Sequence, residues 1–179
     1  MPYTLPERVE TARFTLRRAR VSDAEDIFCA YATDAQVMRF LSAPIPGHPD
    51  QTRAFLAQAE ANWDAGTRFN LAILPKGEDR ILGMIETRVE GAMVAYGYVL
   101  ARAAWGQGCM SEVLRWHVGH ALAHPSIWRV EALCDAENLA SARVMEKVGM
   151  LREGLLKRRL TLPNLAPEPR DALLYARCV

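Results

Sequence analysis

The sequence lacks long apolar runs, an excess of charge of one sign and closely spaced cysteines, and each absence excludes a class of protein. No stretch approaches the roughly 18 apolar residues of a membrane-spanning helix, and residues 1–14 contain no apolar segment of signal-peptide length. The formal net charge is +1, so no general field attracts nucleic acid or an anionic membrane. We therefore expect a cytoplasmic protein with neither nucleic acid nor membrane among its partners.

Neither the cysteines nor the histidines form a metal-binding pattern. The four cysteines are widely scattered and include no Cys-x-x-Cys pair: Cys29, Cys109, Cys134 and Cys178. Reduced thiols are the simplest interpretation of this usage. His117, His120 and His124 share one predicted helix, but no cysteine or carboxylate partner is evident beside them. We expect no metal site, a partly buried His117 and two surface histidines.

The chain contains a regular alternation of predicted strands and helices. Its 179 residues fit one domain, residues 1–179, with enough hydrophobic residues for a sizeable core. Ser22 and Glu25 match a capping box, and Phe55 and Trp63 fall on the expected buried side of a later helix. Apolar periodicity predicts strands at 14–16, 69–73, 81–89, 94–100, 128–134, 150–160 and 172–177, and helices at 24–31, 37–41, 50–65, 110–123 and 138–148.

The connections between these elements predict the topology. Short turns after residues 73 and 89 imply an antiparallel meander. The later strand–helix–strand order adds a parallel pair of strands. The fold class is therefore mixed α/β, with a largely antiparallel sheet of six to seven strands flanked by helices.

The sharpest local motif runs from Trp105 to Glu112, between a predicted strand and a predicted helix. Gly106 and Gly108 allow the backbone to turn tightly. The following helix start offers free N–H groups and a partial positive charge, which together suit a pyrophosphate. The spacing matches neither the dinucleotide-binding nor the P-loop pattern. By itself, a plain loop before a helix explains the motif equally well.

A second motif starts at Asn138, where a strand is expected to end and a helix to begin. It reads Asn138-Leu139-Ala140-Ser141 and continues to Gly149. Asn138 alone is equally compatible with a simple helix N-cap. The two motifs in this order, with strands between them, are far more specific than either one alone.

Together these motifs resemble those of the GNAT acetyltransferases, and within them the ribosomal-protein alanine/serine N-acetyltransferase branch. That branch typically reads Trp-Gly-x-Gly-Tyr-Ala-x-Glu and then Asn-x-x-Ser-x-x-x-x-Glu-Lys-x-Gly-Phe. The strand segment Gly97-Tyr98-Val99-Leu100 is also similar to the family's. The matching positions of this chain are Trp105, Gly106, Gly108, Glu112, Asn138, Ser141, Glu146, Lys147 and Gly149.

The resemblance implies the GNAT fold with a splayed parallel pair, acetyl-CoA as cosubstrate and no metal. The N–H groups of residues 106–111 would hold the pyrophosphate, and the strand at 98–100 would pair with the pantetheine arm. Asn138 would bond the pantetheine or nearby backbone, and Ser141 would lie near the CoA sulfur. The implied coenzyme-binding residues are Tyr98, Val99, Leu100, Trp105, Gly106, Gln107, Gly108, Cys109, Met110, Ser111, Asn138 and Ser141.

Four positions depart from the family pattern. Cys109 and Met110 replace the usual Tyr and Ala, and both remain compatible with binding of phosphates by the backbone. Met145 stands where many GNAT enzymes carry a Tyr that protonates the leaving thiolate, so Ser141 becomes the candidate donor. Ala95 stands where branch members often carry a Glu, which leaves the general base open.

The missing Glu affects acceptors differently. About a tenth of a free α-amine is neutral at pH 7, against roughly one in several thousand for lysine. Water or Glu86 would remove the proton, although Glu86 fits a solvated strand residue better. Glu112 would orient the amine or simply favour the helix start. Cys109 is interpreted as a packing residue, so we expect direct attack in a ternary complex, with Ser141 and Glu86 as candidate catalytic residues.

Two function classes follow from the sequence. The leading hypothesis is an enzyme that acetylates a primary amine, either a protein N-terminal α-amine or a small molecule. The alternative is a non-catalytic acyl-CoA-binding sensor. Segments 35–52 and 162–170 are expected to shape the acceptor cleft. A monomer and a homodimer both remain open.

Overall fold

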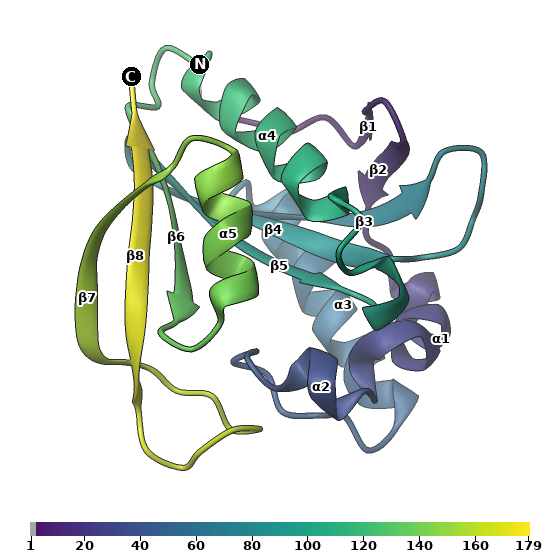
Figure 1. Ribbon diagram of the computed structural model, residues 1–179. Helices are drawn as coiled ribbons and strands as arrows, with labels where there is room; N and C mark the ends of the chain where they lie inside the picture. The colour runs from purple at the N-terminus through teal and green to yellow at the C-terminus, as the bar shows by residue number, and fades with distance from the viewer. Residues whose placement is uncertain (1–2) are drawn as a thin grey trace.

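The computed structural model describes residues 3–179 and consists of one eight-stranded sheet with helices on both faces (Figure 1). The strand order is β1-β2-β3-β4-β5-β6-β8-β7, and every neighbouring pair is antiparallel except β5 with β6. The strands are β1 (Arg8–Glu10), β2 (Phe14–Arg18), β3 (Arg68–Pro75), β4 (Gly83–Glu90), β5 (Met93–Leu100), β6 (Arg129–Asp135), β7 (Leu151–Leu160) and β8 (Arg170–Cys178).

Different helices cover the two faces of the sheet. In Figure 1, α4 (Cys109–Leu122) and α5 (Leu139–Lys147) lie in front of the sheet, and α3 (Pro49–Asp64) lies behind it. Near α3 lie the short helices α1 (Ala24–Ile27) and α2 (Ala35–Met38), with a π-helical turn at 28–32 and a 3₁₀ turn at 21–23. A further 3₁₀ turn, Arg102–Ala104, follows β5.

Each face of the sheet has its own core, and β3 contributes to both. Leu71 and Ile73 pack in the cluster beneath α4, while Ala72 and Leu74 pack in the cluster beside α1 and α3. Alternate residues of a strand point to opposite faces, so a strand buried on both sides is largely apolar, and in β3 the buried polar exception is Asn70. The central part of the sheet is therefore packed against a hydrophobic core on each face.

The predicted architecture and most predicted elements are confirmed, with three corrections. The sheet has one strand more than the upper predicted count, because three-residue β1 is too short to show alternation. Ser22 does not cap the first helix; the Arg20 N–H donates to the carboxylate of Asp23 at 2.8 Å. Phe55 was expected in the core but is 47% exposed, whereas Trp63 is buried.

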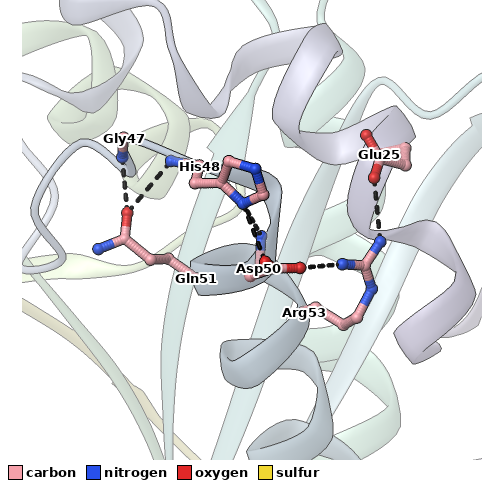
Figure 2. A network of polar contacts seen from close by, with 6 residues as sticks. All are labelled: Glu25, Gly47, His48, Asp50, Gln51 and Arg53. Atoms are coloured by element: carbon pink, nitrogen blue, oxygen red, sulfur yellow. Dashed lines mark hydrogen bonds and ion pairs between the residues drawn. The ribbon is translucent and has the colours of Figure 1, made fainter.

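The start of α3 is held by the polar network of Figure 2. His48 Nδ1 accepts from the Asp50 N–H at 3.3 Å, and Gln51 Oε1 accepts from the Gly47 N–H at 2.6 Å. Arg53 bridges Asp50 and Glu25, whose Oε1 lies 2.9 Å from Arg53 Nη2. These contacts attach the loop before α3 to the first turn of α3, and Arg53 attaches α3 to α1, which anchors one segment expected to shape the acceptor cleft.

Candidate functional site

The parallel strands β5 and β6 part after a short pairing. They pair from Met93 with Arg129 to Tyr96 with Ala132, and no further. Residues 97–100 stay paired with β4, and residues 133–135 stay paired with β8. Each strand is thus held by its outer neighbour while the inner edges diverge, as Figure 1 shows. The predicted splay of the parallel pair is confirmed.

Backbone polar groups of β5 point into this split. The Ala101 N–H donates to Leu82 O at 2.7 Å, on the β4 side. Because backbone groups of successive strand residues alternate between the two edges, Tyr98 and Leu100 direct theirs away from β4 and toward β6. The indole Nε1 of Trp105 donates to Leu100 O at 2.8 Å. The N–H and C=O of Tyr98 and the N–H of Leu100 therefore face a gap of the kind that an extended ligand could enter.

The loop between β5 and α4 requires its two glycines for their backbone conformation. Gly106 and Gly108 both have φ of +73°, which other residues rarely adopt. Gly108 is the N-cap of α4 and provides no side-chain cap, and the first helical bond of the turn is the Glu112 N–H to Gly108 O at 3.1 Å. The N–H groups of Cys109, Met110 and Ser111 therefore start the helix without intrahelical partners, as an anion site needs.

Arg13, which lies outside the motif, binds this loop and the first turn of α4. Arg13 Nε lies 2.6 Å from Glu112 Oε2, its N–H donates to Oε1 at 2.9 Å, and its Nη1 donates to Gln107 O at 3.0 Å. Burial opposes ionisation of Glu112, yet the bonds from Arg13 outweigh it and hold the pKa of this carboxyl below its usual value. Sequence reasoning missed Arg13, because nothing in a single sequence links positions 99 residues apart.

At the start of α5, Ser141 is held by two side chains. Asn138 is the N-cap, and its Oδ1 accepts from the Ser141 N–H at 3.2 Å. Tyr98 Oη lies 2.8 Å from Ser141 Oγ and 3.3 Å from Ser141 O. The Tyr98 side chain thus joins β5 to α5, a contact that the strand pattern could not predict. We expected Asn138 to bond either the pantetheine or nearby backbone, and its bond to the Ser141 N–H is of the second kind.

The thiols of Cys109 and Cys134 and the side chain of Met145 are buried in one apolar core cluster. Met145 is fully buried in the core beneath α5. Burial raises the pKa of the Cys134 thiol to about 11 and also raises the pKa of Cys109. Both thiols are therefore protonated at neutral pH and poor nucleophiles.

The structure does not bring Glu86 to the same face as Ser141. Glu86 lies opposite Gly97 in the β4–β5 pairing, whereas Tyr98, which contacts Ser141, lies opposite Ile85. Neighbouring positions alternate between faces, so Glu86 and Ser141 lie on opposite sides of the sheet. Glu86 Oε1 accepts from Arg88 Nη1 at 2.7 Å, and its side chain is only 20% exposed. It is a partly buried, paired carboxylate rather than a freely solvated one.

The two loops expected to shape the acceptor cleft meet through one residue. Asn164 Nδ2 donates to Met38 O and to Ala43 O, both at 2.8 Å, and Asn164 Oδ1 accepts from the Ile45 N–H at 3.1 Å. We call this set of three bonds the Asn164 clasp. It fastens the β7–β8 loop onto the segment after α2, and sequence reasoning identified both loops but not the residue that joins them.

Beside the β7–β8 loop, a hollow of about 520 Å³ opens at the end of β6. Arg170 lines this hollow and binds the buried carboxylate of Asp135, which is 1% exposed, through contacts of 2.6 and 3.2 Å. Arg170 also lies 3.0 Å from Glu137. The lining has two arginines, Arg158 and Arg170, and three carboxylates, Glu137, Glu168 and Asp171, so charged groups of both signs face the hollow.

The histidine helix forms no metal centre within residues 3–179, where no group of three or more His, Cys, Asp or Glu side chains could hold an ion. His117 is fully buried rather than partly buried, and its Nε2 has no hydrogen-bond partner among the described residues. His120 and His124 pack edge-on against Tyr3. In the same described part of the chain, no helix combines the length and apolarity needed to cross a bilayer.

Comparison with known proteins gives consistent results. A family model described as "Acetyltransferase (GNAT) domain" matches residues 13–151. The uncharacterized N-acetyltransferase p20 of Bacillus licheniformis is 27% identical over 156 residues, 84% of this chain and 86% of the relative.

Two solved structures share the fold over nearly the whole chain. A GNAT-family acetyltransferase from Bacillus anthracis superposes with a TM-score of 0.82 at 25% identity and covers 96% of this chain and 98% of its own. RimL, a ribosomal L7/L12 α-N-protein acetyltransferase in complex with coenzyme A, gives a TM-score of 0.85 at 22% identity, with coverage of 97% and 98%.

Proposed function

This chain belongs to the GNAT acetyltransferase family, and on that premise we propose that it transfers the acetyl group of acetyl-CoA by direct attack of a primary amine. Membership makes it an acetyl-CoA-dependent N-acetyltransferase. The acceptor in this proposal is a protein N-terminal α-amine, with a small-molecule amine as the second candidate. The α-amine is favoured because a useful fraction of it is neutral at pH 7 without help from a base.

The observation that carries the proposal is the parted edge of β5 followed by the glycine loop and α4. The pantetheine arm would pair with the free backbone groups of Tyr98. The pyrophosphate would accept from N–H groups in residues 106–111, with Asn138 Nδ2 as a further donor to the arm. Trp105 and Gln107 hold this loop by donating to Leu100 O and Ala103 O.

In the proposed reaction, the amine nitrogen bonds to the thioester carbon and the carbon–sulfur bond breaks. Negative charge develops first on the carbonyl oxygen, which the Leu100 N–H would stabilise, because the Ala101 N–H is already used by Leu82. The thiolate would then accept a hydrogen bond from Ser141. The amine proton would pass to water or to Glu86, which would act from the opposite face of the sheet. The raised pKa values of Cys109 and Cys134 support direct attack over an acetyl-enzyme.

The test is CoA release from acetyl-CoA with a panel of peptides that have free N-termini, the same peptides with blocked N-termini but a lysine, and small amines. We expect release with free N-termini and little with blocked peptides. Release only with small amines would move the acceptor to the second candidate. Tight binding of acetyl-CoA without release to any amine would favour the sensor alternative and contradict the proposal.

A matched pair of variants tests the coenzyme site. Gly108→Val strains a residue with φ of +73°, and we expect the Kd for CoA to rise at least tenfold. Gly119→Ala lies in the same helix with open space around it, and we expect unchanged affinity. Equal CoA affinity in the two variants would remove the pyrophosphate loop from the proposal.

A further inference from the structure

We propose that Tyr98 is a positioning residue for the transfer, whose phenol directs the single proton of the Ser141 hydroxyl toward the leaving sulfur. This inference rests on the proposed function. The observation behind it is the 2.8 Å contact between Tyr98 Oη of β5 and Ser141 Oγ of α5.

Three contacts fix Ser141 in place. Its N–H donates to Asn138 Oδ1, and both its carbonyl oxygen and its Oγ lie within hydrogen-bonding distance of Tyr98 Oη. Tyr98 is the second residue beyond the last β5–β6 pair, so it lies where the two strands have begun to part, and its side chain reaches Ser141 on α5. The hydroxyl of Ser141 therefore has a defined position where a ligand in the split would end.

The direction of the hydrogen bond decides whether Ser141 can donate to another group. A serine hydroxyl has one proton, and a tyrosine hydroxyl has one as well. If Ser141 donated to Tyr98, it would have no proton left for the sulfur. Burial raises the pKa of Tyr98 above its ordinary value, so its phenol stays protonated. Of its two possible acceptors, Ser141 Oγ at 2.8 Å is nearer than Ser141 O at 3.3 Å, so we assign the phenol proton to Oγ. The Ser141 proton is then free to point into the split, and the two bonds strengthen one another.

Acidities argue against Tyr98 as the final source of the proton. An alkyl thiol has a pKa of about 8.5 and a phenol in water about 10, and burial moves Tyr98 further up. Transfer from the phenol to the thiolate is therefore uphill. In the balanced step, the electron pair of the carbon–sulfur bond goes to sulfur, the thiolate accepts a hydrogen bond from Ser141, and it takes its proton later from water.

The test compares two tyrosines on one face of one strand. Tyr98→Phe removes the hydroxyl that contacts Ser141. Tyr96→Phe removes a buried hydroxyl two residues earlier, which donates to His117 O at 2.9 Å, and serves as the matched control. CoA release is measured with the best amine of the panel, alongside the Kd for CoA and the melting temperature of each variant.

We expect Tyr98→Phe to lower kcat about tenfold, in line with the loss of support for a hydrogen bond to a charged group, with the KM for acetyl-CoA within about threefold of wild type. Tyr96→Phe should keep the wild-type kcat while lowering the melting temperature. Ser141→Ala should lower kcat at least as much as Tyr98→Phe. The double variant should be no slower than Ser141→Ala, because the two hydroxyls act as one unit.

Two results would overturn the inference: equal kcat values for the Tyr98→Phe and Tyr96→Phe variants, or losses that multiply in the double variant. Failure of the proposed function looks different. Wild-type protein would then release no CoA with any amine, a result visible before any variant is compared.

Discussion

His117 carries a titratable ring into the core of the protein. It is 0% exposed, lies 3.4 Å from Thr87 Oγ1 through Nδ1, and packs edge-on against Tyr96 and Trp116. Burial, with a smaller effect of His120, lowers the pKa of His117 to about 3. The imidazole is therefore neutral in the folded protein at every physiological pH.

This neutral ring makes the fold sensitive to acid. In the unfolded chain, histidine has a pKa of about 6.5, so between about pH 6.5 and pH 3 only the unfolded state binds the proton. The free energy of unfolding falls over this window as the pH falls, by up to about 1.4 kcal/mol per pH unit from this residue, and is unaffected above it. We expect His117→Phe to flatten the decline measured by urea denaturation between pH 7.5 and 4.5.

The control for this prediction is His48→Asn, since the side chain of His48 is 70% exposed. That variant should keep the wild-type dependence on pH. A His117→Phe variant whose unfolding free energy declines as steeply as that of wild type would contradict the burial argument, whatever its stability at pH 7.5.

At the scale of elements, Arg13 connects the beginning of β2 to the loop before α4. One guanidinium contacts both the Glu112 carboxylate and the Gln107 carbonyl, so it links the helix to the loop that precedes it. An exposed ion pair stabilises a protein by only about 0.2–1 kcal/mol, and the Arg13 side chain is 50% exposed. Its larger effect should therefore be on the geometry of the loop rather than on global stability.

We expect Arg13→Ala to raise the KM for acetyl-CoA about three- to tenfold and to leave kcat within twofold, because a loosened loop presents its N–H groups less accurately. Steady-state kinetics with varied acetyl-CoA provides the measurement. Arg8→Ala is the control, since Arg8 pairs only with exposed Glu10. Unchanged KM in Arg13→Ala would show that the loop holds its conformation alone.

The Asn164 clasp joins two other elements, the β7–β8 loop and the segment after α2. We expect Asn164→Ala to raise the KM for the amine several-fold, because all three bonds are lost and the walls proposed for the acceptor cleft loosen. The KM for acetyl-CoA should not change. Initial rates with each substrate varied in turn separate the two effects.

The matched control is Asn62→Ala, which removes a contact with Gln58 on α3. If Asn164→Ala altered both KM values equally, the clasp would support the whole fold rather than the acceptor side. If Asn164→Ala behaved like Asn62→Ala, the clasp would have no role in acceptor binding.

At the scale of the whole molecule, local signals predicted the order and type of the longer elements. Apolar periodicity located α3, α4 and the strands β3 to β8 within a few residues. It failed for β1, which has three residues, and for the first helix, which breaks into a four-residue α-helix and a π-helical turn. Short elements contain too few positions to display a period.

The backbone conformations at the candidate site were predictable from local motifs. Glycines before a helix and an asparagine at a helix N-cap can be recognised from a few neighbouring residues. Gly106, Gly108 and Asn138 adopt the conformations that such motifs require. Side-chain contacts across the fold, such as Tyr98 with Ser141, depend on register and twist. A single sequence fixes neither quantity.

The sheet consists of a five-stranded and a three-stranded plate that meet along a seam of four residue pairs. The two strands at this seam are hydrogen-bonded at one end and separated at the other. A pantetheine arm bound at the separated end would act as a temporary ninth strand and extend the hydrogen bonding between the two plates. The cosubstrate would then stabilise the relative position of the two plates. Each release of CoA would remove this stabilisation.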